Sequence, residues 1–177
     1  LGVSMTGICD NTFLSTPSQD LAEALSYLRS YCVEINKVYA ERIGIEASAA
    51  ITCVKPSGTV SQLVDAASGI HPRFAHQYIR RVRMDKKDPL AHWMQEKGIP
   101  CEDDFYGSGN LVFSFPQRAP QGAKVTDDFS AIQQLELWSV YQKFWCEHKP
   151  SVTIYVGPTE WDEVGEWVWQ NRQIISG

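Results

Sequence analysis

The stretch CVKPSGTVSQL brings several groups that can bind an anion into one short segment. Ser57, Thr59 and Ser61 carry hydroxyl donors, and Gly58 would let a ligand approach the backbone without a Cβ in the way. Pro56 stiffens the entry to the turn. If an apolar strand ends here and a helix begins, unpartnered backbone N–H groups also point out of the helix start. The stretch therefore predicts an anion-binding turn, with phosphate as the natural ligand.

The same turn also has a purely structural interpretation. Pro-Ser-Gly-Thr is an ordinary turn followed by a helix cap, and the phosphate-loop pattern GxxxxGK[ST] does not occur in the chain. Ligands of α/β proteins usually bind at the carboxyl ends of strands, which is where this turn is expected to fall. The local pattern alone leaves both interpretations open.

Other residues with chemical potential are more typical of structural roles. Cys53 directly precedes the turn, but a thiol on a buried strand usually behaves as a small apolar residue. His71 and His76 have no cysteine at metal-binding spacing, and the acidic cluster at 102–104 is typical of a solvated loop. Basic residues also gather between 71 and 87, and we call this group the basic stripe. Such a stripe either neutralises phosphate or pairs with carboxylates elsewhere in the protein. Its members are His71, Arg73, His76, Arg80, Arg81, Arg83, Lys86 and Lys87.

Length and composition narrow the classes of function. The 177 residues are 44% apolar and 21% charged, which is typical of a folded domain large enough to bury a core. A net charge of -5 argues against a general nucleic-acid or membrane-surface binder. The five cysteines are scattered without a CxxC pair, which favours reduced thiols, no zinc site and a cytoplasmic location. The sequence shows no signal-peptide pattern and no apolar run long enough to cross a bilayer.

Apolar periodicity and capping residues predict the helices that would position the turn. Thr16 followed by Pro17 is a typical helix start, and an apolar stripe at spacings of three and four then continues to Gly44. Asp88 and Pro89 repeat the start signal. The predicted helices run over 17–44, about 59–65, 89–98 and about 129–147, and a last one begins in GPTEWDEVGEWVWQ with Thr159 as its cap.

Four apolar runs predict strands between these helices, namely LGVSMTGI, AAITCV, LVFSF at 111–115 and SVTIYV at 151–156. The Gly- and Pro-containing stretch 98–128 is interpreted as a long excursion around one strand. Strands that alternate with helices favour a parallel α/β architecture. The expected fold is therefore α/β, with the turn at the end of the second strand.

Several segments, in consistent order, resemble one enzyme family. TCVKPSGTVSQL is followed by SGIHPRFAHQYIRRVR, PCEDD, VFSFP, QLELWSVYQKFWCEHKPSVTIYV and a terminal ISG. Together they resemble the adenosylcobalamin-dependent, monomeric ribonucleoside-triphosphate reductases, the class II branch of the ribonucleotide reductases. The similarity extends over nearly the whole chain, which makes it more specific than any single motif.

The resemblance implies a fold and a reaction. The family folds as a ten-stranded α/β barrel of two parallel halves, and residues 1–177 would be one partial domain, the C-terminal half of that barrel with flanking helices. In the family a thiyl radical, generated by homolysis of a cobalt–carbon bond, abstracts the 3′ hydrogen of a ribonucleotide. A cysteine pair supplies electrons as the 2′ hydroxyl leaves as water. Such an oxidoreductase serves deoxyribonucleotide biosynthesis and DNA replication.

The resemblance also implies site residues and partners. The family's phosphate-binding loop matches this chain at Ser57, Gly58, Thr59, Val60 and Ser61. The implied substrate is a ribonucleoside triphosphate, and the implied reductant is of the thioredoxin type. Adenosylcobalamin would bind mainly to regions outside this chain, and deoxynucleotide effectors would act through regions that are also missing here.

The departures from the family pattern limit what the chain can do alone. The Asn-Pro-Cys finger loop that carries the radical cysteine does not occur, and neither does the family's C-terminal cysteine pair. The sequence starts at Leu1 inside an apolar run, so we expect a piece of a longer protein, inactive alone and without catalytic residues or metal ligands of its own. Two alternatives stay open: a non-catalytic α/β binding or assembly module, and a reductase of another class with a separate radical-generating subunit.

Overall fold

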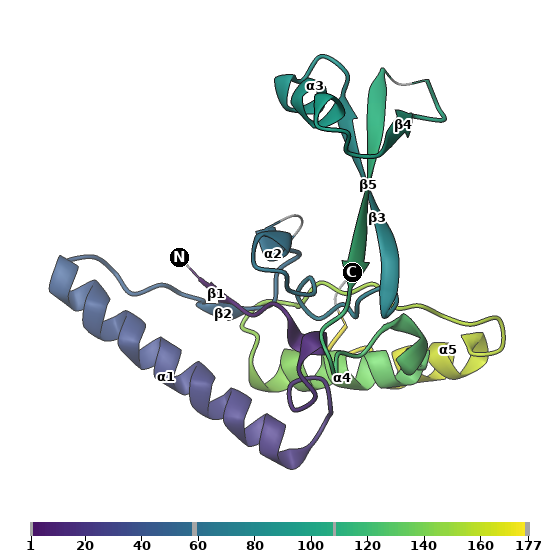
Figure 1. Ribbon diagram of the computed structural model, residues 1–177. Coiled ribbons are helices and arrows are strands. Elements are labelled where there is room, and N and C mark those ends of the chain that lie inside the picture. The colour runs from purple at the N-terminus through teal and green to yellow at the C-terminus, as the bar shows by residue number, and fades with distance from the viewer. Residues whose placement is uncertain (1, 58–59, 108, 176–177) are drawn as a thin grey trace. The chain divides into compact units, whose positions relative to one another are not determined.

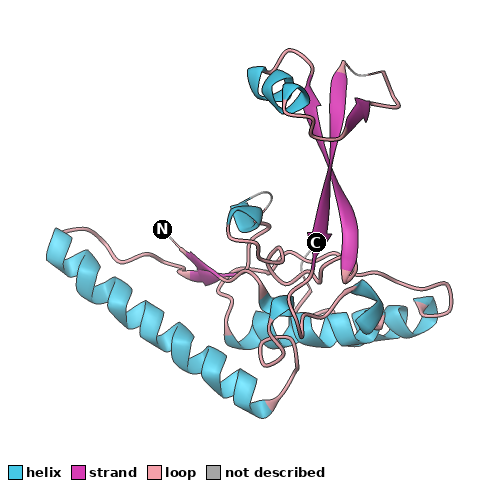
Figure 2. Cartoon of the chain, in the orientation of Figure 1, coloured by secondary structure: helices cyan, strands magenta, loops and turns pink. Residues whose placement is uncertain are grey.

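The computed structural model describes residues 2–57, 60–107 and 109–175, and the chain divides into two compact units. The first unit comprises residues 1–74 and 120–177, and the second comprises residues 75–119. Figures 1 and 2 show the helices and strands of each. In chain order the elements are β1 Val3–Ser4, the 3-10 turn η1 Ile8–Asp10, α1 Gln19–Ile43, β2 Thr52–Cys53, α2 Val60–Leu63, β3 Gln77–Asp85, α3 Pro89–Glu96, β4 Cys101–Asp103, β5 Asn110–Arg118, the 3-10 turn η2 Thr126–Asp128, α4 Ala131–Phe144 and α5 Trp161–Gln170.

The long helix α1 starts two residues later than the sequence predicts. Its N-cap is Ser18, whose side chain accepts a hydrogen bond from the backbone N–H of Leu21. The predicted cap, Thr16, instead donates its hydroxyl to the carbonyl oxygen of Thr12 at 2.7 Å, within the preceding turn. The predicted end at Gly44 is confirmed, and its φ of 72° is readily adopted by a residue without a Cβ.

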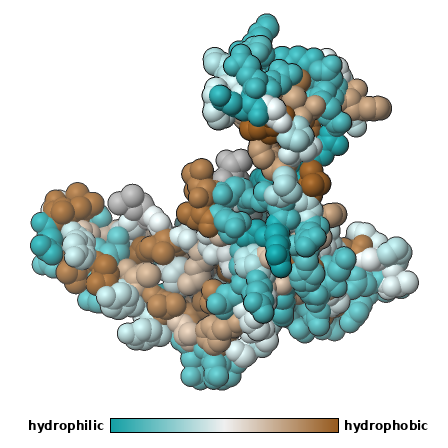
Figure 3. All heavy atoms as spheres, in the orientation of Figure 1, coloured by the Kyte–Doolittle hydropathy of each residue, from teal (hydrophilic) through white to brown (hydrophobic). Residues whose placement is uncertain are grey.

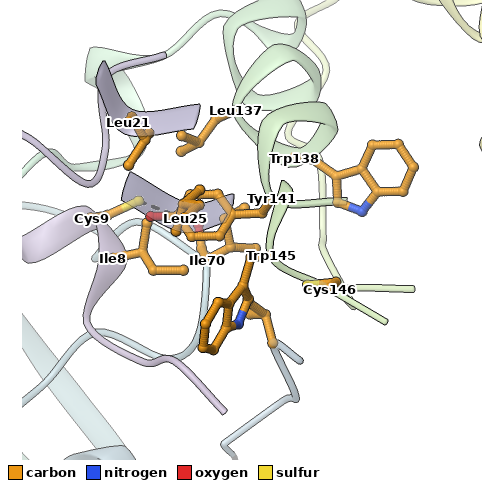
Figure 4. Packing of buried hydrophobic residues seen from close by; sticks show 11 residues of the cluster. Ile8, Cys9, Leu21, Leu25, Ile70, Leu137, Trp138, Tyr141, Trp145 and Cys146 are labelled. Atoms are coloured by element: carbon orange, nitrogen blue, oxygen red, sulfur yellow. Dashed lines mark hydrogen bonds between the residues drawn. The ribbon is translucent and has the colours of Figure 1, made fainter. Parts of the chain in front are cut away.

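Helices α1 and α4 build the core of the first unit. The capping box that starts α4 joins Ser130 and Gln133, and one face of the helix is buried over most of its length. Figure 4 shows side chains of α1 and α4 gathered around the segment that contains η1. The buried cluster consists of Ile8, Cys9, Leu21, Leu25, Val54, Ile70, Leu137, Trp138, Tyr141, Trp145 and Cys146. Because Val54 and Ile70 belong to this cluster, the core anchors the chain on both sides of the predicted phosphate-binding turn.

Strand β2 is held along both of its edges. On one side it pairs in parallel with β1. The carbonyl oxygen of Cys53 accepts two hydrogen bonds, one from the backbone N–H of Met5 just after β1 at 3.2 Å and one from the indole Nε1–H of Trp145 at 2.7 Å. On the other side the carboxylate of Glu147 accepts the backbone N–H groups of Ile51 and Thr52. Burial alone would raise the pKa of Glu147, but these hydrogen bonds outweigh it and hold the pKa below its ordinary value. The end of α4 therefore fixes the strand that leads into the turn.

The second unit contains an antiparallel sheet in the order β3-β5-β4, which differs from the parallel arrangement predicted. The strand predicted in LVFSF is confirmed and extends over Asn110–Arg118. Its partner β3 lies in the basic stripe, where the sequence was not assigned a strand. Residues of β3 alternate between exposed and half-buried. Arginines occupy both faces, with Arg80 half-buried and Arg81 and Arg83 exposed, so apolar and polar residues do not alternate along the strand and the period of two is not visible in the sequence.

Helix α3 confirms the start signal read at Asp88 and Pro89. The carboxylate of Asp88 accepts the backbone N–H of Leu90 at 2.8 Å. The helix buries Ala91 and Met94 in a small core with Leu111 and Phe113 of β5. The carboxylates at 102–104 pair with three exposed side chains of the basic stripe, which confirms for those three the expected pairing with carboxylates. The pairs are Arg81 with Glu102, Arg83 with Asp104, and Lys86 with Asp103. The prediction of a solvated loop at 102–104 is wrong in part, because residues 102 and 103 lie on β4 and Asp104 is buried.

Two predictions near the C-terminus are wrong. The segment 151–156 is not a strand, because several of its backbone groups bond to side chains. Thr153 donates its N–H to His71, while Tyr155 exchanges two hydrogen bonds with the amide of Gln134. Thr159 is not the cap of α5, which follows Glu160. The Glu160 carboxylate accepts the N–H groups of Gly157 and Ala131 instead.

The observed fold is mixed α/β, with a parallel pair in the first unit and an antiparallel sheet in the second. The α/β class is thus confirmed, while the exclusively parallel arrangement is not seen in the described residues. None of the helices in the described part of the chain is both long and apolar enough to span a membrane.

Candidate functional site

The predicted phosphate-binding turn lies where two parallel strands end. β1 and β2 run side by side, so the segments after Ser4 and after Cys53 leave the sheet at the same edge. The two segments remain in contact, since Ser4 accepts the backbone N–H of Lys55 on its Oγ at 3.0 Å. This edge is the usual location of ligand sites in α/β proteins.

Three of the five predicted site residues fall within the described part of the chain. Ser57 is half-buried, Val60 is exposed and Ser61 is buried. The backbone N–H of Val60 donates to the carbonyl oxygen of Ser57 at 3.0 Å, which closes the turn. Gly58 and Thr59 lie outside the described residues. Because α2 spans only four residues, a helix dipole adds little here, and hydroxyl and backbone N–H donors remain as the anion-binding groups.

A second hydroxyl-bearing segment, which the sequence analysis missed, lies against the turn. The Oγ atoms of Ser57 and Ser68 are 2.7 Å apart. Thr6, just after β1, accepts the backbone N–H of Gly69 on its hydroxyl oxygen and donates that hydroxyl to the carbonyl oxygen of Ala67. The described part of the site is therefore built by residues 4–10, by 54–57 with 60–61, and by 65–73. Ser68 begins SGIHPRF, one of the segments that resemble the reductase family. Its hydroxyl, in a segment that shares the family pattern, could have indicated that this segment also belongs to the site.

Gly69 allows these segments to approach one another. Its φ is 56°, and a Cβ at this position would lie 3.1 Å from the carbonyl oxygen of Lys55 and 3.3 Å from a methyl group of Val54. A side chain would thus press on the backbone just before the turn. The close approach explains why the residue after Ser68 has no side chain.

Arg73 pairs with carboxylates, as one interpretation of the basic stripe predicts, but it is buried and not part of a solvated face. Its side chain is 3% exposed and forms two hydrogen bonds with the carboxylate of Asp10, at 2.8 and 3.1 Å. A third contact joins Arg73 Nη1 to Asp65 Oδ1 at 3.1 Å. The hydrogen bond with Asp10 is the main reason that the pKa of Arg73 lies above its ordinary value, with burial acting in the opposite direction. Arg73 is therefore a buried, charged residue that contacts Asp65, four residues after Ser61.

The cysteines and His71 have structural surroundings. Cys53 is buried, as expected for a thiol that behaves as a small apolar residue, and its Sγ lies 3.6 Å from the carbonyl oxygen of Val3. Burial is the main cause that raises the pKa of Cys9 and of Cys146 to about 12, so both stay thiols at neutral pH.

Both ring nitrogens of His71 are engaged, one by the carbonyl oxygen of Ser68 and the other by the N–H of Thr153. Within the described residues no three His, Cys, Asp or Glu side chains are grouped as a metal site would require.

Comparison with known proteins identifies relatives of this chain. A probable adenosylcobalamin-dependent ribonucleoside-triphosphate reductase of Dictyostelium discoideum is 32% identical over 165 residues, which are 89% of this chain and 21% of the relative. The adenosylcobalamin-dependent ribonucleoside-triphosphate reductase of Lacticaseibacillus paracasei is 30% identical over 164 residues, or 88% of this chain and 21% of the relative. No family model matches the chain. The chain spans about one fifth of the length of these relatives.

A solved structure has the same fold. The crystal structure of a B12-dependent, class II ribonucleotide reductase superposes with a TM-score of 0.82 and 24% identity, over 97% of this chain and 28% of that protein. The resemblance inferred from the sequence is therefore confirmed. This chain is related to one region of the adenosylcobalamin-dependent ribonucleoside-triphosphate reductases.

Proposed function

We propose that this chain is part of an adenosylcobalamin-dependent ribonucleoside-triphosphate reductase and that the loop Ser57–Ser61 binds the phosphates of the substrate. The observation that carries the proposal is the contact between Ser57 and Ser68 at the carboxyl ends of β1 and β2. It gathers hydroxyl and amide donors from two segments at one edge, as recognition of phosphate oxygens requires. The relatives that match this region bear the reductase name.

The residues of this chain would bind and orient the substrate without transferring a proton. The Ser57 hydroxyl can exchange its contact with Ser68 for one with a phosphate oxygen, because a hydroxyl is both donor and acceptor. Loop amides and the predicted donors Gly58 and Thr59 would complete the cradle. Anchored phosphates hold the ribose in one place, and such positioning lowers the barrier of a reaction that another part of the protein performs. That part would carry the radical cysteine and the reducing cysteine pair.

We assign no residue of this chain to adenosylcobalamin. His71 does not fit as an axial ligand, because both of its ring nitrogens are already engaged. The cofactor would accordingly bind mainly to other regions of the complete protein. The same holds for a thioredoxin-type reductant and for deoxynucleotide effectors, and we propose the cytoplasm as the location of the enzyme.

The proposal includes a larger barrel around this chain. A parallel pair of two-residue strands is small for an independent sheet, and parallel sheets are normally covered on both faces. Apolar side chains also remain exposed along α1, among them Tyr31, Ile35 and Val38, and Figure 3 shows hydrophobic surface over this helix. These features support residues 1–177 as one partial domain, the C-terminal half of a ten-stranded α/β barrel.

The complete protein provides the test of the proposed function. We expect it to reduce ribonucleoside triphosphates when adenosylcobalamin and a dithiol reductant are supplied, without a second protein subunit. The measurement is the formation of 2′-deoxyribonucleotide from ribonucleoside triphosphate, with the diphosphate as a parallel substrate. A requirement for a separate radical-generating subunit would indicate another reductase class. Absence of both reduction and nucleotide binding would favour a non-catalytic module.

A further inference from the structure

The backbone of Asp65 adopts a conformation that its neighbours must stabilise. Its φ is 48°, and it is the single non-glycine residue with a positive φ in the parts of the chain that the structure describes. L-residues other than glycine, asparagine and aspartate rarely occupy this left-handed region, because the Cβ approaches the following carbonyl. The side chain of Asp65 is 75% exposed, so packing around it does not impose the conformation.

Arg73 supplies contacts that can hold this conformation. Its Nη2 donates to the backbone carbonyl oxygen of Asp65, and its Nη1 donates to the Asp65 carboxylate. The planar guanidinium is fixed in turn by two hydrogen bonds to Asp10, which follows β1 on η1. A buried fork of this kind has one orientation available to it. Arg73 thereby joins the η1 segment to the segment that follows α2.

The segment after Asp65 contacts both ends of the proposed phosphate loop, so its position affects both. The N–H of Ala66 donates to the carbonyl oxygen of Ser61 at 2.9 Å, at the end of the loop. The N–H of Ala67 donates to the carboxylate of Asp10 at 2.7 Å. Ser68 contacts Ser57 at the start of the loop.

We propose that Arg73 is a positioning residue: anchored by Asp10, it fixes the left-handed backbone at Asp65 and so sets the positions of Ser57 and Ser61, the two ends of the proposed phosphate loop. The inference rests on the proposed role of that loop in phosphate binding. Arg73 does not contact the substrate in this account. It acts through the segment 65–68.

The Asp65 position offers a pair of variants that separates conformation from charge. Asp65→Ala and Asp65→Gly both remove the carboxylate, but only glycine adopts a φ of 48° without steric cost. In the complete reductase we expect Asp65→Ala and Arg73→Lys to raise KM for the ribonucleoside triphosphate about tenfold, with kcat changed less than about twofold. We expect Asp65→Gly to stay close to the unmodified enzyme. Glu102→Gln, which breaks an exposed ion pair of the second unit, is the matched control and should leave KM unchanged.

Amide hydrogen exchange over residues 54–69, measured without nucleotide, tests the positioning independently of phosphate binding. We expect faster exchange in Arg73→Lys and Asp65→Ala, and near-normal exchange in Asp65→Gly. Unchanged exchange and unchanged KM in the first two would overturn the inference, as would equal effects of Ala and Gly at position 65. If exchange responds as expected but KM does not, the positioning stands and the proposed phosphate role fails. Should Arg73→Lys not fold, the two Asp65 variants decide the matter.

Discussion

The indole Nε1 of Trp145 donates a hydrogen bond of 2.7 Å to the carbonyl oxygen of Cys53, the last residue of β2. Trp145 is 1% exposed and Cys53 is 7% exposed, so water cannot readily replace this bond. The contact joins the end of α4 to the strand that leads into the proposed phosphate loop. The position of the loop therefore depends on a residue 92 positions away in the sequence.

Removing that donor should destabilise the first unit. Trp145→Phe keeps an aromatic ring but removes the shorter of the two hydrogen bonds to the buried carbonyl of Cys53, leaving only the one from the backbone N–H of Met5. The loss of one such bond typically costs about 0.5–1.5 kcal/mol. Chemical denaturation of the protein measures the change in the free energy of unfolding. Trp169→Phe is the control, because Trp169 is 66% exposed, and we expect a change within about 0.5 kcal/mol. Equal effects of the two substitutions would contradict the role of the hydrogen bond.

Glu147 predicts a pH dependence of stability. Its pKa in the folded protein lies below the ordinary 4.5, so the folded state favours the charged carboxylate. The stabilisation is present above the ordinary pKa and is lost as the pH falls through the lower, folded-state pKa. Glu147→Gln should reduce the unfolding free energy at pH 7 by roughly 1.5–3 kcal/mol, as expected for hydrogen bonds to a charged group. The difference should shrink when unfolding is repeated at pH values below the folded-state pKa.

The exposed Glu136 of α4 serves as the control for this pH profile. Glu136→Gln should leave the shape of the stability curve nearly unchanged. A Glu147→Gln variant whose deficit stays constant from neutral to strongly acidic pH would show that the carboxylate charge is not what holds β2.

Gly69 and Gly165 differ in the space that an added Cβ would have. Gly69→Ala would place a Cβ 3.1 Å from the carbonyl oxygen of Lys55 at a φ of 56°, so we expect a loss of about 1–3 kcal/mol and weaker binding of ribonucleoside triphosphate. Gly165→Ala is the control, because a Cβ there meets no atom within 4 Å and lies inside α5. That substitution should stabilise the protein by about 0.5–1 kcal/mol through helix propensity. Tolerance of Gly69→Ala with full stability and affinity would argue against the close approach.

Local sequence signals predicted those elements whose determinants lie within a few residues. Asp88 with Pro89 marked the start of α3, and Gly44 marked the end of α1. The predicted cap at Thr16 was wrong because its hydroxyl donates to the carbonyl oxygen of Thr12, while the hydroxyl of Ser18 accepts the N–H of Leu21 and caps the helix. Spacing does not decide between these two hydroxyl residues. The strand β3 was missed because its arginines hide the alternation.

The site was predictable only in part, since its remaining residues come together through long-range contacts. The turn sequence indicated Ser57 and Ser61 directly. Asp10 and Arg73 are 63 residues apart, and nothing in their local surroundings shows that they pair. Arg73 was grouped with its basic neighbours for that reason. Segment 151–156 failed in a similar way, because side chains distant in sequence satisfy part of its backbone.

The central claim, that residues 57–61 bind the substrate phosphates, is tested most directly by equilibrium binding to the complete protein carrying Gly58→Val. A Cβ with two methyl groups should block the approach of a phosphate, so the Kd of the ribonucleoside triphosphate should rise about tenfold or more. The Kd of the corresponding nucleoside, which has no phosphate, should stay the same. Unchanged affinity for the triphosphate, in a variant that unfolds at the same temperature as the unmodified protein, would contradict the claim.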